Sequence, residues 1–360
     1  MKTVALDLIF VGFGHVGRRF ARLLQERENV LARAYGLTWR AIGIATRRHG
    51  IAVNPAGLDV TQALALVERG GSLADLRGNA ATGPRGTLGS GLELIESATH
   101  AADADRAQVV VETTVLDITR GQPAIDHVRK ALRAGAHVIT ANKGPAAFAF
   151  RELDDFANAL GRSFLFEGAV MDGVPIFNLV RETLPAVTVL GFRGVINGTT
   201  NHVLTQMEEG HAFDEAVAEM RAAGVAEADA SLDVDGWDAA AKTAALLNVL
   251  MKAETTPREI DRTGIGGLTP EMLQEAMRAG QRLRLVASGE RRDGKAVGRV
   301  APERLPEHHV LAGLTGTQNA LVLQTDLLGE ICITQLEGGL TQTAYALLGD
   351  LVAVRRRLRT

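Results

Sequence analysis

Three glycines near the start of the chain constrain its fold more than any other feature. They stand in the segment IFVGFGHVG, residues 9–17, between an apolar run and an amphipathic one. In a strand–turn–helix of this kind the first glycine permits a tight turn, the second lets the backbone approach a pyrophosphate, and the third lets the helix pack closely on the strand. The N-terminus of the helix then faces the anion. We expect a dinucleotide site here, the alternative being a glycine-rich turn without a ligand. The contacts expected are Gly12, Phe13, Gly14, His15, Val16 and Gly17.

The first 145 residues alternate short apolar runs with helical stretches, which is typical of parallel strands joined by crossover helices. The runs are nearly continuous in apolar residues, as in a sheet that is covered on both faces. The sequence therefore predicts an α/β fold with a doubly wound, Rossmann-type sheet. Strands are expected at 5–11, 39–45, 108–112 and 137–140, and helices at 15–28, 61–69 and 122–134. Residues 78–90, rich in glycine, predict a turn-rich insertion.

After Pro145 the spacing of apolar runs changes, and a second domain of mixed helices and strands is expected. Its first helix is expected to end near 160, and further helices are expected at 175–183, 199–209, 213–223, 237–253 and 270–279. Its strands are expected at 164–167, 187–196, 283–288, 296–300, 320–324 and 330–335. A last helix is expected over about 342–358.

Composition excludes several classes of function. The 39 basic and 42 acidic residues nearly balance, so charge alone provides no surface for nucleic acid or an anionic membrane. No apolar run reaches the roughly 18 to 20 residues that span a bilayer, and the start does not read as a signal peptide, so we expect a cytoplasmic protein. The single cysteine, Cys332, rules out an internal disulfide and is expected to be a packed core thiol. The nine histidines are scattered, which argues against metal-assisted hydrolysis.

The choice between the two nicotinamide cofactors is made at the end of the second strand. An acidic residue there would bind the ribose hydroxyls of NAD, but the sequence reads Ile44-Ala45-Thr46-Arg47-Arg48. Arginine pairs strongly with phosphate, so Arg47 and Arg48 favour NADP. A solvated turn is the competing interpretation, and use of NAD as well stays open.

Lys143 directly follows the expected strand 137–140, at the edge where open α/β sheets bind their ligands. Asn142, Gly144 and Pro145 around it predict an ordered turn. A role in the site is therefore expected, against the alternative of a surface lysine.

A second candidate site combines acidic residues with a lysine. Five carboxylates stand within twelve residues, which suits a substrate that carries an ammonium group; they are Glu227, Asp229, Asp233, Asp235 and Asp238. Asp238 and Lys242 are four residues apart, so on a helix their side chains meet on one face. Composition alone also fits a surface salt bridge.

A third glycine-rich segment, residues 194–201, runs from an expected strand into an expected helix. Its backbone N–H groups, including those of Gly198 and Thr199, and its two threonine hydroxyls could hold a substrate carboxylate. Helix capping by Asn197 or Thr199 is an equally good explanation.

Three segments taken together, TANK at 140–143, INGTTN at 196–201 and DVDGWDAAAK at 233–242, resemble homoserine dehydrogenases over nearly the whole chain. The resemblance implies NAD(P)-dependent interconversion of L-homoserine and L-aspartate 4-semialdehyde, a step in threonine, methionine and isoleucine biosynthesis. It implies that Lys242 transfers the proton, that Asp238 and Asp233 bind substrate, and that Glu227 holds the substrate amino group. Lys143 would lie between cofactor and substrate, and the sequence does not rank the two lysines.

The resemblance extends to further residues and to the assembly. Backbone carbonyls at Glu167, Val170, Asp172 and Val174 would bind a monovalent cation, which is sodium in the family's pattern. The cofactor contacts would be completed by Thr113, Thr114, Lys143 and Gly339. The domains would be 1–145 with the last helix, about 340–360, for NADP, and 146–339 for catalysis and dimerisation. A homodimer built partly on the strands between 283 and 335 is implied, and no regulatory ACT domain follows, so feedback by threonine through such a domain is not expected.

Two other functions compete with this one. A semialdehyde or sugar dehydrogenase on the same cofactor fold is the nearest, although a phosphorylating enzyme needs a cysteine nucleophile and Cys332 is a poor candidate. A non-catalytic NADPH sensor would keep the three glycines but would have no need for the two lysines and the acidic segment.

Overall fold

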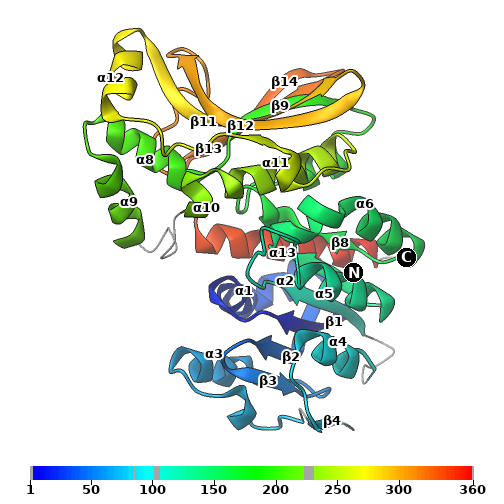
Figure 1. Cartoon of the computed structure of the whole chain (residues 1–360). Coiled ribbons are helices and arrows are strands. Elements are labelled where there is room, and N and C mark those ends of the chain that lie inside the picture. The colour runs from blue at the N-terminus through cyan, green and yellow to red at the C-terminus, as the bar shows by residue number, and fades with distance from the viewer. Residues whose placement is uncertain (1–2, 81, 84–85, 101–105, 223–230, 359–360) are drawn as a thin grey trace. The chain divides into compact units, whose positions relative to one another are not determined.

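The glycine-rich segment joins a buried strand to a helix, as expected. In the computed structural model β1 (Val4–Val11) leads through the turn into α1 (His15–Glu26), and the structure describes residues 3–80, 82–83, 86–100, 106–222 and 231–358. β1 is buried over its last six residues, because it has a strand on both sides and helices on both faces. This strand is the centre of the first of two compact units (Figure 1).

The sheet of the first unit has the order β3-β2-β1-β6-β7-β8. Its strands are β2 (Leu37–Thr46), β3 (Gly50–Val53), β6 (Ala107–Glu112), β7 (His137–Thr140) and β8 (Phe164–Leu165). All neighbours run parallel except β2 and β3. The chain passes from β1 to β2 on one side and later to β6 on the other, so the order reverses beside β1, where such sheets bind ligands. The α/β expectation is confirmed.

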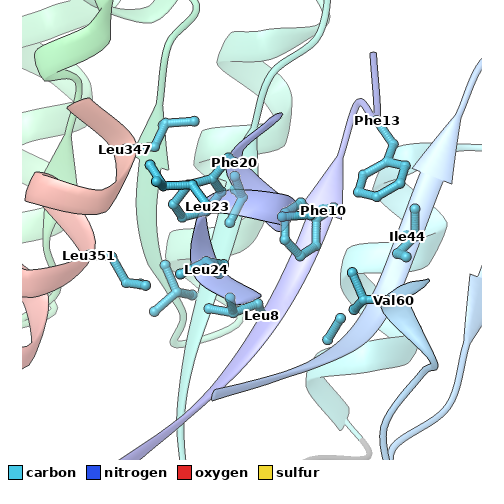
Figure 2. Close-up of a cluster of buried hydrophobic side chains, with 14 of the residues drawn as sticks. Leu8, Phe10, Phe13, Phe20, Leu23, Leu24, Ile44, Val60, Leu347 and Leu351 are labelled. Atoms are coloured by element: carbon cyan, nitrogen blue, oxygen red, sulfur yellow. The ribbon is translucent and has the colours of Figure 1, made fainter. Parts of the chain in front are cut away.

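Helices cover the two faces of this sheet. They are α1, α2 (Glu28–Tyr35), α3 (Val60–Glu68), α4 (Gly91–His100), α5 (Ala124–Arg133), α6 (Lys143–Ala159) and α13 (Leu340–Arg357). Figure 2 shows Leu347 and Leu351 of α13 beside Phe20 and Leu24 of α1, and all four side chains are fully buried. The last helix of the chain thus completes the core of the first unit.

Several short elements were not expected from the sequence. The helix expected at 15–28 ends at Glu26 and a separate α2 follows, β3 forms a hairpin with β2, and α4 lies beyond the turn-rich insertion. Within that insertion β4 (Thr82–Gly83) pairs with β5 (Gly86–Thr87). The single-turn helices η1 (Leu73–Asp75) and η2 (Glu167–Ala169) also belong to this unit.

The second unit is built on a mostly antiparallel sheet with the order β10-β12-β11-β9-β13-β14. Its strands are β9 (Val189–Val195), β10 (Asp261–Arg262), β11 (Gln281–Arg292), β12 (Lys295–Pro306), β13 (Asn319–Thr325) and β14 (Gly329–Gln335). β11 and β12, of twelve residues each, form a hairpin closed by Asp293 and Gly294, both with positive φ. This hairpin is about twice as long as expected.

Helices pack on this sheet and carry the acidic segment. They are α7 (Ile176–Asn178), the π-helical turn η3 (Leu179–Thr183), α8 (Gly198–Glu208), α9 (Phe213–Ala222), α10 (Ser231–Val234), α11 (Trp237–Leu250), η4 (Pro257–Glu259) and α12 (Pro270–Arg278). A Cβ atom added to Gly289 or Gly298 would lie 2.9 or 2.7 Å from side-chain atoms of Leu247, so α11 packs directly on the hairpin.

The chain passes from one unit to the other at four points. One comprises residues 1–145, 151–173 and 339–360, and the other 146–150 and 174–338. Residues 151–173, expected in the second domain, fall in the first unit because β8 pairs with β7 and the Glu167 N–H donates to the Asp350 carboxylate of α13. Among the described residues, no helix is both long and apolar enough to cross a bilayer.

Candidate functional site

The turn after β1 is shaped by two glycines and leaves the third one open. Gly12 has φ +90, and a Cβ atom there would lie 2.6 Å from the Thr113 carbonyl group. A Cβ at Gly17 would lie 2.7 Å from the carbonyl oxygen of Gly12. At Gly14, in contrast, a Cβ would meet no atom within 4 Å. Packing therefore explains two of the glycines, while the glycine at 14 leaves space for a ligand.

The N-terminus of α1 fits an anion. Gly14 is the N-cap and provides no side chain, so a bound ligand can take the place that a Ser or Asp would fill. Phe13 is buried with its ring 5.5 Å from that of Phe10, so only its backbone is available (Figure 2). His15 is exposed and Val16 is partly buried. The turn is therefore open to an anion, and a pyrophosphate contact here stays a prediction.

The carboxyl ends of four parallel strands bring the other expected cofactor residues to one edge. Thr113 and Thr114 follow β6, and Lys143 begins the helix that follows β7. The Thr113 hydroxyl donates to the Gly12 carbonyl at 2.6 Å, which ties the two turns together. Arg47 and Arg48 are exposed in the turn between β2 and β3.

A buried carboxylate that the sequence did not single out lies beneath this edge. Glu112, the last residue of β6, is fully buried, and its Oε1 accepts the Thr114 N–H and hydroxyl. Its Oε2 accepts the Thr140 hydroxyl at 3.0 Å. Buried between apolar strand residues, Glu112 carries no periodic signal in the sequence, and only the pairing of β6 with β7 brings its partners together.

In the second unit, four polar side chains meet where β9 ends and α8 and α11 begin. Lys242 donates to the Ile196 carbonyl at 2.8 Å and pairs with Asp238 at 3.0 Å. The Asn197 amide donates to Asp238 Oδ2 at 2.9 Å and to Asp233 Oδ1 at 2.7 Å. The structure therefore brings together Asp233, Asp238 and Lys242, and adds Asn197, which sequence analysis considered only as a helix cap.

The burial of this cluster weighs against a surface salt bridge. The side chains of Lys242 and Asp238 are 14% and 17% exposed, and the Asn197 side chain is buried. An ammonium held by one carboxylate and one carbonyl in such a place has a fixed position, as proton transfer requires. Glu227, the expected partner of the substrate amino group, and Asp229 lie outside the described residues.

The start of α8 shows helix capping. Asn197 Oδ1 accepts the Thr200 N–H at 2.8 Å, so capping by Asn197 is confirmed. A Cβ at Gly198 would lie 2.9 Å from the Thr317 carbonyl oxygen, which explains that glycine by packing. Thr199 is buried beside it at 8% exposure.

The expected cation loop follows β8. Glu167 and Val170 are buried, and Asp172 has φ +46. The Asp172 carboxylate accepts the Gly339 N–H at 3.2 Å and the Thr343 hydroxyl at 2.9 Å, so it caps α13, whose N-cap residue is Gly339. In the second unit, the Val174 carbonyl accepts the Ile176 N–H at 2.9 Å.

Cys332 does not form part of a core. It lies exposed on β14, the edge strand, where alternate residues face away from the sheet. The expectation of a packed thiol is wrong. The apolar residues of β14 suggested a buried strand, but β14 lies at the edge of the sheet and its side chains are less buried than those of a central strand. Within the described residues, no three His, Cys, Asp or Glu side chains come together as metal ligands.

Comparisons with known proteins agree on one family. The family model "Homoserine dehydrogenase" matches residues 175–352, and "Homoserine dehydrogenase, NAD binding domain" matches residues 12–167. An NAD(+)-dependent homoserine dehydrogenase of Pseudomonas canavaninivorans is 35% identical over 97% of this chain and 96% of its own.

Solved structures give the same result. A putative homoserine dehydrogenase of Archaeoglobus fulgidus superposes with a TM-score of 0.82 at 30% identity, covering 98% of this chain and 99% of that one. A hyperthermophilic archaeal homoserine dehydrogenase in complex with NADPH gives a TM-score of 0.78 at 28% identity, covering 99% and 98%.

Proposed function

Since this chain belongs to the homoserine dehydrogenase family and is an NAD(P)-dependent oxidoreductase, we propose that Lys242 transfers the proton in its reaction. That reaction interconverts L-aspartate 4-semialdehyde and L-homoserine. The observation that carries the proposal is the Lys242 ammonium, held between the Asp238 carboxylate and the Ile196 carbonyl in a largely buried position.

The proposed reaction divides between the cofactor and the side chains of this protein. The nicotinamide, when bound, supplies the hydride to the aldehyde carbon. Lys242 Nζ gives its proton to the oxygen that becomes the homoserine hydroxyl, and takes that proton back in the oxidative direction. Asp238 orients the ammonium, and Asn197 holds Asp238 and Asp233 in place through its amide. Asp233, Asp238 and Glu227 are proposed to bind the substrate ammonium, and the start of α8 at Gly198 and Thr199 its carboxylate.

The proposed role of Lys242 is tested by its removal. General acid catalysis contributes about 10²- to 10⁴-fold, so Lys242→Ala is expected to lower kcat by that factor, or about 3–5 kcal/mol of barrier. NADPH binding, measured by fluorescence titration, is expected to stay within about twofold. An equal loss of cofactor affinity would refute the assignment.

Lys143 is proposed as the second lysine of the site, polarising the reacting oxygen beside the cofactor. Its place at the first turn of α6, after β7, supports this. In Lys143→Ala we expect a higher KM for NADPH together with a lower kcat, whereas Lys242→Ala changes kcat alone. If Lys242→Ala raised the KM for NADPH and Lys143→Ala lowered kcat alone, Lys143 would be the proton donor and Lys242 the lysine beside the cofactor.

NADP is proposed as the preferred cofactor. Arg47 and Arg48 are exposed at the carboxyl end of β2, and no acidic residue stands there to bind ribose hydroxyls. A charge-assisted pair with phosphate is worth about 1.5–3 kcal/mol, so replacing both arginines by serine should raise the KM for NADPH about tenfold or more. The KM for NADH should change little. A wild-type enzyme that prefers NADH would overturn this proposal. Because one relative is NAD(+)-dependent, the wild-type enzyme must be assayed with both NADPH and NADH.

A monovalent cation, sodium, is proposed to bind backbone carbonyls at Glu167, Val170, Asp172 and Val174. The Asp172 carboxylate is engaged with α13, so the proposal rests on the carbonyls of this loop. Replacing sodium by choline at constant ionic strength should lower activity and thermal stability. Equal behaviour in both salts would speak against a cation site.

A homodimer is proposed from the edge of the second sheet. Among the described residues β14 pairs with β13 alone, and Leu328 and Leu336 beside it are 52% and 67% exposed. An uncovered edge with exposed apolar side chains favours association. Light scattering should give twice the 38.2 kDa of the chain, and a mass of one chain would exclude the dimer.

A further inference from the structure

Glu112 lies at the centre of a closed ring of hydrogen bonds at the carboxyl edge of the first sheet. The Thr114 N–H and hydroxyl donate to its Oε1, the former at 3.2 Å. The Thr140 hydroxyl donates to its Oε2 at 3.0 Å and accepts the Asn142 N–H at 2.9 Å. The ring closes where the Asn142 amide donates to the Thr114 carbonyl at 3.0 Å.

This ring fixes two loops that the proposed function needs. On one side Thr114 follows Thr113, whose hydroxyl holds the Gly12 carbonyl of the glycine-rich turn. On the other side Asn142 caps α6 by accepting the Gly144 N–H at 2.8 Å, and Lys143 stands between these two residues. The positions of Lys143 and of the pyrophosphate turn are therefore coupled through one carboxylate.

A carboxylate is needed at the centre because every bond to it is donated. It accepts at both oxygens, and His127 Nδ1 lies 3.4 Å from Oε1. A glutamine at this position would turn an NH₂ group toward the Thr140 hydroxyl, which would then lose its acceptor. The burial of Glu112 leaves no water to repair that loss.

From this geometry we propose that Glu112 is a positioning residue of the dehydrogenase reaction, which sets Lys143 and the Thr113–Thr114 segment in register with the bound cofactor. The inference rests on the proposed cofactor site. Glu112 touches neither cofactor nor substrate in this proposal and acts through Asn142, Thr114 and Thr140.

The test compares Glu112→Gln with a matched buried carboxylate of the same sheet. Asp7 on β1 is also fully buried, and it accepts from Arg40 Nε and Nη2 at 2.8 and 3.0 Å, outside the ring. In Glu112→Gln we expect kcat to fall by about 10- to 100-fold, as for a misplaced reacting group, and the KM for NADPH to rise several-fold. The KM for aspartate 4-semialdehyde should change less than twofold. Asp7→Asn should lower thermal stability at least as much and leave all three constants of the folded enzyme within twofold.

A double-mutant cycle separates positioning from general loss of stability. Thr140→Val breaks the same ring but keeps the carboxylate, and it serves as the primary variant if Glu112→Gln does not fold. The ring predicts that the double variant is no slower than the slower single variant. Additive losses in kcat, or losses that Asp7→Asn reproduces, would overturn the inference. Inactivity of the wild-type enzyme with aspartate 4-semialdehyde and either NADPH or NADH would instead refute the proposed function.

Discussion

At the residue scale, the polar side chains of this protein are held by partners distant in sequence. Asn197 reaches Asp233 and Asp238, and Glu112 reaches Thr140, in each case across a strand end. A hydrogen bond to a charged group is worth about 1.5–3 kcal/mol, and an unpaired buried partner costs as much. Each of these two clusters therefore holds its side chains in place because its members satisfy each other.

His137 provides a residue-scale prediction outside the site. Burial, together with the positive charges of Arg162 and Arg357, lowers the pKa of His137 to about 4 from an ordinary value of 6.5. The unfolded chain therefore takes up a proton at higher pH than the folded one, so stability is present above pH 6.5 and is lost as the pH falls toward 4. The shift corresponds to at most about 3 kcal/mol.

The change to make is His137→Asn, because an asparagine Oδ1 can accept the Ser163 N–H that the His137 Nδ1 accepts at 3.0 Å. Urea unfolding between pH 4 and 6.5 should show a flatter free energy of unfolding in the variant. The exposed His308, replaced in the same way, should leave the wild-type profile unchanged. An identical slope in wild type and His137→Asn would contradict the assignment.

At the scale of elements, most helices and strands follow from periodicity and turn residues. The strand–glycine–helix order around β1 could be predicted from the sequence because each of the three glycines is needed for a different physical reason. The length of the β11–β12 hairpin was not inferred, although Asp293-Gly294 is a strong signal for a two-residue turn with positive φ at both positions. The charged residues on its distal part hid the alternation there. β3 was missed because it has only four residues.

The glycine-rich turn gives a matched pair of predictions. In Gly17→Ala the new Cβ meets the Gly12 carbonyl, so a loss of about 1–3 kcal/mol in the free energy of unfolding is expected. In Gly14→Ala it meets no protein atom, so thermal stability should stay the same. The KM for NADPH should nevertheless rise about tenfold, or about 1.4 kcal/mol, because the methyl group occupies the space of the ligand. A Gly14→Ala enzyme with unchanged KM would contradict the proposed pyrophosphate site.

At the scale of the whole molecule, the alternation of apolar runs and helical stretches anticipated the α/β architecture, and the family resemblance anticipated the activity. The division of the chain into two units needed the structure. Residues 151–173 return to the first unit through a two-residue strand, β8, and through the Glu167–Asp350 hydrogen bond. Neither feature has a pattern in the sequence. Glu112 was missed for the same reason, since its role comes from strand pairing.

Because the proposed cofactor and substrate residues belong to different units, each ligand is expected to protect its own unit from hydrogen exchange. NADPH alone should slow exchange at the turns after β1, β6 and β7. Homoserine alone should slow it around Asn197 and Lys242. At a concentration of 100 times its Kd, either ligand should stabilise the unit that it binds by about 2.7 kcal/mol. Protection of 196–242 by NADPH alone, with none at 12–17, would contradict the assignment of the sites.

The packing of α13 against α1 has a consequence for how the protein is made. The strands and helices of residues 4–145 leave the ribosome before α13, and Leu347 and Leu351, which close their core, are synthesised only after residues 174–338. The apolar surface of the nascent nucleotide-binding unit stays uncovered while residues 174–338 of the other unit are translated. A premature stop codon just before Leu340 would release a chain that keeps the second unit but lacks the helix that completes the core of the first unit.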